Sequence, residues 1–125
     1  MAEEVSAVSA AAEMARLASA ALYSAPLAYF GNRVQKKGFL RSVLSGEKVG
    51  ALALTEPQAG SDAGSIKTRA RRKGRDFILN VEKRFITNGG VADYLFLFAV
   101  TDPSKPARSA ISAFVIQGIQ RVLTS

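Results

Sequence analysis

The sequence predicts an α+β protein in which a helical pair precedes an antiparallel β-sheet or part of a β-barrel. Alanines and larger apolar residues recur at helical spacing up to about residue 46. From Val49 onward the pattern changes to short apolar runs separated by turn residues, with no helical pattern between them. The chain of 125 residues is long enough for one domain or two small ones. We therefore divide it into a helical part, 1–46, and a β part, 47–125.

The first helix is predicted from Glu3 to about Tyr23. Val5, Val8 and Ala12 fall on one stripe of a helix, and acidic residues in the first turn suit the positive end of the helix dipole. Small residues around the circumference predict close packing against neighbouring helices. We expect a bundle helix that carries no chemistry.

A second helix is predicted after the break marked by Pro26 and Gly31. Asn32 followed three residues later by Gln35 has the form of a capping box, which opens a helix. Gly46 stands where helix ends favour a left-handed residue.

The β part is predicted from apolar runs bounded by turn signals. A buried strand is expected at 51–54, and the segments 66–72 and 76–81 flank Lys73-Gly74-Arg75 as a hairpin would. Later strands are expected at 94–100 and 110–116, joined by the turn 102–106.

Composition excludes several classes of chemistry. The chain has no cysteine and no histidine, which removes disulfides, thiolate ligands and the commonest metal ligand and general base. We predict no metal site, and any catalysis must use carboxylates, hydroxyls, lysines or a cofactor. No apolar stretch reaches the roughly 18 residues of a spanning helix, and the N-terminus lacks the features of a secretory signal. We expect a cytoplasmic location, or the mitochondrial matrix in a eukaryote.

The net charge of +7 allows two interpretations. A clustered basic face would bind nucleic acid or another polyanion. The cluster is interrupted by Asp76 and has no interleaved aromatic residues, which favours a solvated hairpin tip. The basic residues concerned are Lys67, Arg69, Arg71, Arg72, Lys73 and Arg75.

Two segments carry polar residues suited to a cofactor. In the first, 54–62, Gly60 permits close backbone approach while Thr55 and Ser61 offer hydroxyls, a combination suited to a phosphate or the edge of a heteroaromatic ring. In the second, 83–90, Phe85 and Thr87 would share one side of an extended segment and could cover and hydrogen-bond a planar cofactor. Each segment alone is equally compatible with a structural turn.

Together and in this order, 55–62 and 85–90 resemble the paired flavin-site signatures of the acyl-CoA dehydrogenase family. The residues at 35–37 and 44–48 resemble the run-up to that motif, so the resemblance covers essentially the whole chain. It implies a fragment in which 1–46 end the N-terminal helical domain and 47–125 begin the flavin-binding middle β-domain.

The resemblance also implies residue roles. Phe85 would pack beside the isoalloxazine, where the family commonly has tryptophan, and Thr87 would bond the flavin near its reactive nitrogen. Ser61 and Ser109 would contact the acyl-CoA substrate. The residues implied to bind FAD are Leu52, Leu54, Thr55, Gly60, Ser61, Phe85, Ile86 and Thr87.

The activity implied is α,β-dehydrogenation of acyl-CoA thioesters in fatty acid metabolism, with hydride passing to N5 of FAD and electrons leaving to an electron-transfer flavoprotein. The full-length enzyme would be a homo-oligomer not bound to membranes. No catalytic residue is assigned, because Glu56 belongs to the flavin loop and Glu82 to a strand, while the family's base lies in a C-terminal bundle. We therefore expect the chain to be inactive alone.

Three alternatives stay open at the level of sequence. The first alternative is a non-catalytic remnant that binds FAD or CoA, and the second is a polyanion-binding module. The third is an oxidase or a monooxygenase, since these enzymes share the fold and these residues do not distinguish them from a dehydrogenase. The residues do not indicate the length of the acyl chain either.

Overall fold

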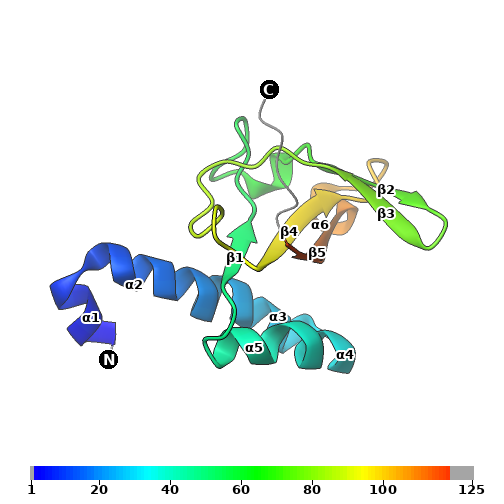
Figure 1. Ribbon diagram of the computed structural model, residues 1–125. Coiled ribbons are helices and arrows are strands. Elements are labelled where there is room, and N and C mark those ends of the chain that lie inside the picture. The colour runs from blue at the N-terminus through cyan, green and yellow to red at the C-terminus, as the bar shows by residue number, and fades with distance from the viewer. Residues whose placement is uncertain (1, 119–125) are drawn as a thin grey trace.

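The computed structural model describes residues 2–118, in which a helical layer lies below a β part (Figure 1). The predicted α+β class is confirmed. Residues 119–125, the end of the predicted β part, lie outside the described range.

The first helical stretch differs from the single helix expected from Glu3 to Tyr23. It breaks at Ser9, whose backbone is extended (φ −153°) and whose side-chain hydroxyl caps the next helix by accepting a bond from the Ala12 amide. It also continues past Pro26, because the residues before and at the start of Ser24–Phe30 keep helical backbone angles. The elements are α1 (Ala2–Val8), α2 (Ala10–Leu17), the π-helix η1 (Ala18–Tyr23) and α3 (Ser24–Phe30). No residue of α1 is buried, so its predicted close packing is wrong.

The second helical stretch begins as predicted. Asn32 and Gln35 form both bonds of the capping box, and Gly46 adopts a left-handed conformation (φ 80°) just beyond the helix end. This stretch comprises α4 (Arg33–Gln35), the π-helix η2 (Lys36–Leu40) and α5 (Arg41–Leu44).

The five-stranded sheet is mixed, not wholly antiparallel. The long strand β4 (Tyr94–Val100) pairs in parallel with β1 (Gly50–Ala53) and antiparallel with β5 (Ile111–Gln117). The hairpin of β2 (Arg69–Lys73) and β3 (Asp76–Asn80) joins β4 through one parallel bridge, Arg69 to Val100. The connection from β1 to β4 is long enough for β4 to return in the same direction as β1.

Most strands lie where the sequence placed them, and the hairpin turn has its left-handed residue at Gly74 (φ 63°). Three local predictions are wrong. Glu82 lies beyond the end of β3, Phe85 is not in extended backbone, and a short helix α6 (Ala107–Ala110) precedes β5, so that Ser109 is helical. A 3-10 turn, η3 (Ala63–Ser65), lies in the glycine-containing loop.

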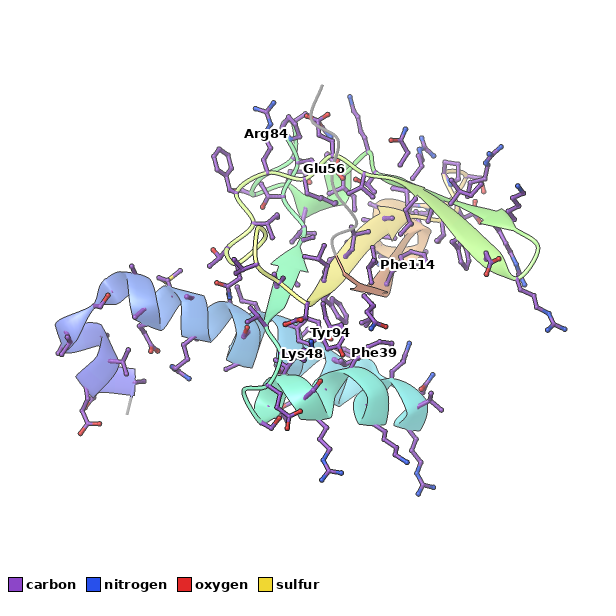
Figure 2. All side chains as sticks on the ribbon, viewed as in Figure 1. Phe39, Lys48, Glu56, Arg84, Tyr94 and Phe114 are labelled. Carbon is purple, nitrogen blue, oxygen red and sulfur yellow. The ribbon has the colours of Figure 1, made fainter. Side chains whose placement is uncertain are left out.

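Aromatic side chains hold the helical layer to one face of β4. Tyr23 is fully buried and stacks with Tyr94 at 6.4 Å between ring centroids, while Phe39 meets Tyr94 edge-on at 5.4 Å. Figure 2 shows Phe39 and Tyr94 meeting between the helices and the sheet. A second cluster of Ala53, Leu97 and neighbouring residues packs on the other face of the sheet.

The junction between helix and strand is made by Ser19 and Gly50. The Ser19 hydroxyl donates to the Gly50 carbonyl at 2.8 Å and accepts from the Gly50 amide at 3.0 Å. A Cβ on Gly50 would stand 2.4 Å from Cγ of Tyr23, so glycine is required for this approach. The junction places the start of β1 beside η1.

Candidate functional site

A cleft forms where η1, the end of β1 and the segment after β3 meet. It has a volume of about 140 Å³, and we call it the junction cleft. Its lining residues are Ala18, Leu22, Leu52, Leu54, Thr55, Phe85, Ile86 and Thr87. The structure thus brings together six of the eight residues expected to contact a flavin, from two segments about thirty residues apart in sequence.

Two segments form the rims of the cleft: the first rim is 52–55 and the second is 85–88. The second rim has an unusual backbone. Phe85 is held at φ 56° and is 91% exposed as a residue, and Asn88 is held at φ 65°. A large side chain rarely adopts this conformation, whereas asparagine tolerates it. The Asn88 side-chain amide donates to the Ala15 carbonyl at 2.8 Å, which anchors the rim to the helical layer.

The lining of the junction cleft suits one edge of a planar ring system. Its lining residues are apolar apart from Thr55 and Thr87, which carry hydroxyls, and the aromatic residue among them, Phe85, is highly exposed. The cleft is smaller than the roughly 300–1,000 Å³ of typical ligand pockets. These residues therefore fit a part of a larger ligand such as a flavin, not the whole of it.

Directly behind the two rims lies a buried ion pair. The Lys83 ammonium is 2.7 Å from Oε1 of Glu56 and also donates to the Leu54 carbonyl at 3.0 Å. The two side chains are 5% and 2% exposed. Figure 2 shows Glu56 among the loops beyond the end of β1, with Arg84 at the edge of the same region.

The Glu56 carboxylate accepts further bonds from the amides of Lys67 and Thr68 and from the side chain of Gln58. Burial alone raises the pKa of Glu56, but the Lys83 ammonium and the two amides outweigh burial and lower that pKa to about 2. A carboxylate so strongly held in its ionised form is a poor proton acceptor at neutral pH. Its contacts are those of a structural group.

The glycine loop does not contribute to the junction cleft. Gly60 and Ser61 are exposed and do not line it, and neither does Ser109 in α6. The loop instead passes beside α6, where a Cβ on Gly64 would contact the Ala107 side chain at 3.4 Å. The segments that carry Ser61 and Ser109 are thus neighbours, away from the residues expected to hold the ring.

Sequence reasoning missed two groups of residues around the cleft. Ala18 and Leu22 line it from a helix that was expected to carry no chemistry, since periodicity does not tell which helix residues face a strand far along the chain. The role of Lys83 was also missed. A glutamate and a lysine 27 positions apart give no local signal of pairing.

The basic cluster lies on the exposed β2–β3 hairpin, as the hairpin interpretation predicts. The hairpin also contacts the sheet, where the Phe77 and Phe114 rings are 5.1 Å apart. Within residues 2–118 no group of three or more acidic, histidine or cysteine side chains is placed to hold a metal ion. Among the same residues, no helix is both long and apolar enough to cross a membrane.

Comparison with known proteins identifies the family. Residues 51–123, more than half of the chain, match the model of the acyl-CoA dehydrogenase middle domain. An acyl-CoA dehydrogenase of Bacillus subtilis is 44% identical over 114 residues, covering 91% of this chain and 30% of the relative.

Solved structures agree with the sequence match. A chain in a structure entitled "Electron transferring flavoprotein of Acidaminococcus fermentans: Towards a mechanism of flavin-based electron bifurcation" superimposes with a TM-score of 0.91 at 41% identity, covering 94% of this chain and 31% of that one. A glutaryl-CoA dehydrogenase of Mycobacterium smegmatis in complex with FADH2 has a TM-score of 0.84 at 32% identity, covering 93% and 28%. The chain therefore spans about 30% of the relatives it matches. From residue 51 onward its sequence is that of a middle domain, and the chain belongs to the acyl-CoA dehydrogenase family.

Proposed function

We propose that this chain supplies the flavin-facing wall and part of the acyl-CoA floor of an FAD-dependent acyl-CoA dehydrogenase. The observation that carries the proposal is the junction cleft, in which six residues from two separate segments converge on one apolar wall with two hydroxyls. In this assignment 1–46 belong to the N-terminal helical domain and 47–125 to the middle domain. When bound, FAD supplies the hydride acceptor for α,β-dehydrogenation of an acyl-CoA thioester.

The chain's own residues bind and orient. Leu52, Leu54 and Ile86 exclude water from one side of the ring, and the Phe85 side chain covers its edge. The hydroxyls of Thr55 and Thr87 hydrogen-bond polar atoms of the ring, where a donor stabilises the negative charge that develops on reduction. Gly60 and Ser61, which do not line the junction cleft, are proposed to contact FAD outside it.

Ser61 and Ser109 are proposed to contact the acyl-CoA. The support is the packing of the glycine loop beside α6, which brings the segments that carry them together. An electron-transfer flavoprotein is the proposed electron acceptor and a homo-oligomer the proposed assembly of the full-length enzyme, both on the strength of the family.

A titration of the purified chain with FAD, followed by quenching of flavin fluorescence, tests the proposal. We expect saturable binding that Thr87→Val and Leu54→Ala weaken, whereas Val8→Ala, which changes an exposed residue of α1, leaves it unchanged. A flat titration of the wild-type chain would contradict the cofactor assignment. The same sample should not reduce a dye acceptor with acyl-CoA, because the described residues hold no carboxylate free to take a proton in the cleft.

The rival interpretation is a non-catalytic module that binds FAD or CoA. It predicts the same result for the FAD titration, but a different result for the activity of the complete gene product. Dye reduction by the gene product in the presence of acyl-CoA supports the dehydrogenase, whereas FAD binding without turnover supports the module.

A further inference from the structure

The Glu56–Lys83 pair connects the two rims of the junction cleft, so that a movement of one rim relative to the other would disturb the pair. Glu56 follows Thr55, the last cleft residue of the first rim, and Lys83 precedes Phe85, the first cleft residue of the second, by two positions. Within residues 2–118, the other hydrogen bond that joins these two segments is a backbone bond from the Arg84 amide to the Thr55 carbonyl at 2.9 Å. The pair therefore spans the two rims.

Lys83 contacts the first rim twice. Its ammonium donates both to the carboxylate of Glu56 at 2.7 Å and to the carbonyl of Leu54 at 3.0 Å. Leu54 and Thr55 both line the cleft, and Glu56 follows them. The Lys83 ammonium therefore holds the first rim at two points, at Leu54 and just after Thr55. Both side chains are almost fully buried, and water screens their attraction little.

Glu56 in turn is fixed from behind. Its carboxylate accepts from the Lys67 amide and, at 3.0 Å, from the Thr68 amide, which leads into β2, while its own amide and carbonyl bond to Ala59 at 3.0 and 3.1 Å and close the turn of the glycine loop. The cation is thus held by a group that is itself anchored to the sheet. A contact that is anchored in this way fixes where the neighbouring groups lie, in addition to stabilising them.

We propose that Glu56 and Lys83 are positioning residues that set the separation of the two rims and so preorganise the junction cleft for the flavin ring. This inference rests on the proposed function. Neither side chain lines the cleft, so each acts through Leu54, Thr55 and Phe85. The polar ends of the two rims, the hydroxyls of Thr55 and Thr87, then stand at a separation that does not depend on the ligand.

The test compares two double variants that each remove one long-range ion pair. Glu56→Gln with Lys83→Met makes the buried pair neutral at similar volume, a change that leaves most folds intact because no unpaired charge remains buried. Lys48→Met with Asp93→Asn is the control. That pair also joins distant segments, at 2.8 Å, but its side chains are 45% and 33% exposed and neither residue lines the junction cleft.

Two readouts are compared, hydrogen exchange at the Arg84 amide without ligand and the Kd for FAD. In the Glu56/Lys83 variant we expect exchange at Arg84 to speed up and the Kd to rise at least about tenfold, since misplacement by an ångström is enough to lose such factors. The Lys48/Asp93 control should change neither. A folded Glu56/Lys83 variant with unchanged exchange at Arg84, or with faster exchange but wild-type FAD affinity, would overturn the inference.

Lys83→Arg keeps the test valid if the double variant does not fold. It preserves the positive charge, but a planar guanidinium cannot donate to the Leu54 carbonyl and the Glu56 carboxylate in the directions of an ammonium. The expected Kd is higher than that of the wild type, and a wild-type Kd would count against positioning. If the wild-type chain binds no FAD, the proposed function fails by itself, and the exchange comparison still decides whether the pair holds the rims together.

Discussion

Phe85 combines two properties that stability alone does not explain. Its backbone is in the left-handed region, which costs a residue with a large side chain about 1–2 kcal/mol. The residue is 91% exposed, so burial recovers little of that cost. Strain of this type persists only where the surroundings fix it, and it concentrates at functional sites. The conformation presents the ring at the mouth of the junction cleft.

Replacing this phenylalanine by glycine should therefore stabilise the chain. We expect Phe85→Gly to raise the free energy of unfolding by about 1 kcal/mol, measured by chemical denaturation, because glycine adopts a positive φ without strain. The same change should weaken FAD binding, since the aromatic face is lost.

Asn88 is the matched control for Phe85. It has a similar backbone (φ 65°), but its side chain bonds to Ala15, so Asn88→Gly should lower the free energy of unfolding. A loss of stability in Phe85→Gly as large as in Asn88→Gly would show that Phe85 is not strained.

At the scale of elements, the contact of η1 with β1 decides where the cleft forms. Ser19 brackets both backbone groups of Gly50, and Tyr23 fills the space that a side chain at position 50 would occupy. The Tyr23 ring has no room to retreat, because Tyr94 and Phe96 pack against it.

Gly50→Ala should destabilise the chain by about 1–3 kcal/mol, the usual cost of overpacking a close-packed contact. Gly38→Ala is the control. It likewise adds a methyl group to a glycine, here in the helical layer, but nothing lies within 4 Å of the added atom. It should raise the free energy of unfolding by about 0.5–1 kcal/mol through helix propensity. Equal midpoints of thermal unfolding for the two variants would contradict this account of the junction.

The elements that the sequence predicted are those determined by neighbours along the chain. The capping box of Asn32 and Gln35 and the turn at Gly74 are local patterns, and both are confirmed. The parallel pairing of β1 with β4 and the approach of Leu22 to the cleft depend on segments dozens of residues apart, about which local patterns are silent. Gly60 and Ser61 were grouped with Thr55 because they adjoin it in sequence, although the turn closed by Glu56 and Ala59 directs the loop away from the cleft.

At the scale of the whole molecule, the net charge and the buried Glu56–Lys83 pair both determine how stability changes in acid. The chain carries a formal net charge of +7 at neutral pH, and protonation of its carboxylates adds positive charge and self-repulsion. Glu56 is the buried carboxylate among those whose pKa is lowered, whereas Asp93 and Asp102 are held by partners nearer the surface. Acid stability should therefore depend most on Glu56.

The pKa of Glu56 is lowered from 4.5 to about 2 on folding, so the stability it provides is complete above pH 4.5 and is lost as the pH falls toward 2. The loss over this window is on the order of 3 kcal/mol. Free energies of unfolding measured by denaturant titration at several pH values should fall steeply there in the wild type. In the Glu56→Gln, Lys83→Met variant, which has no carboxylate at this position to protonate, the slope should be clearly smaller. Parallel slopes in the two proteins would mean that exposed carboxylates, and not the buried pair, govern acid unfolding.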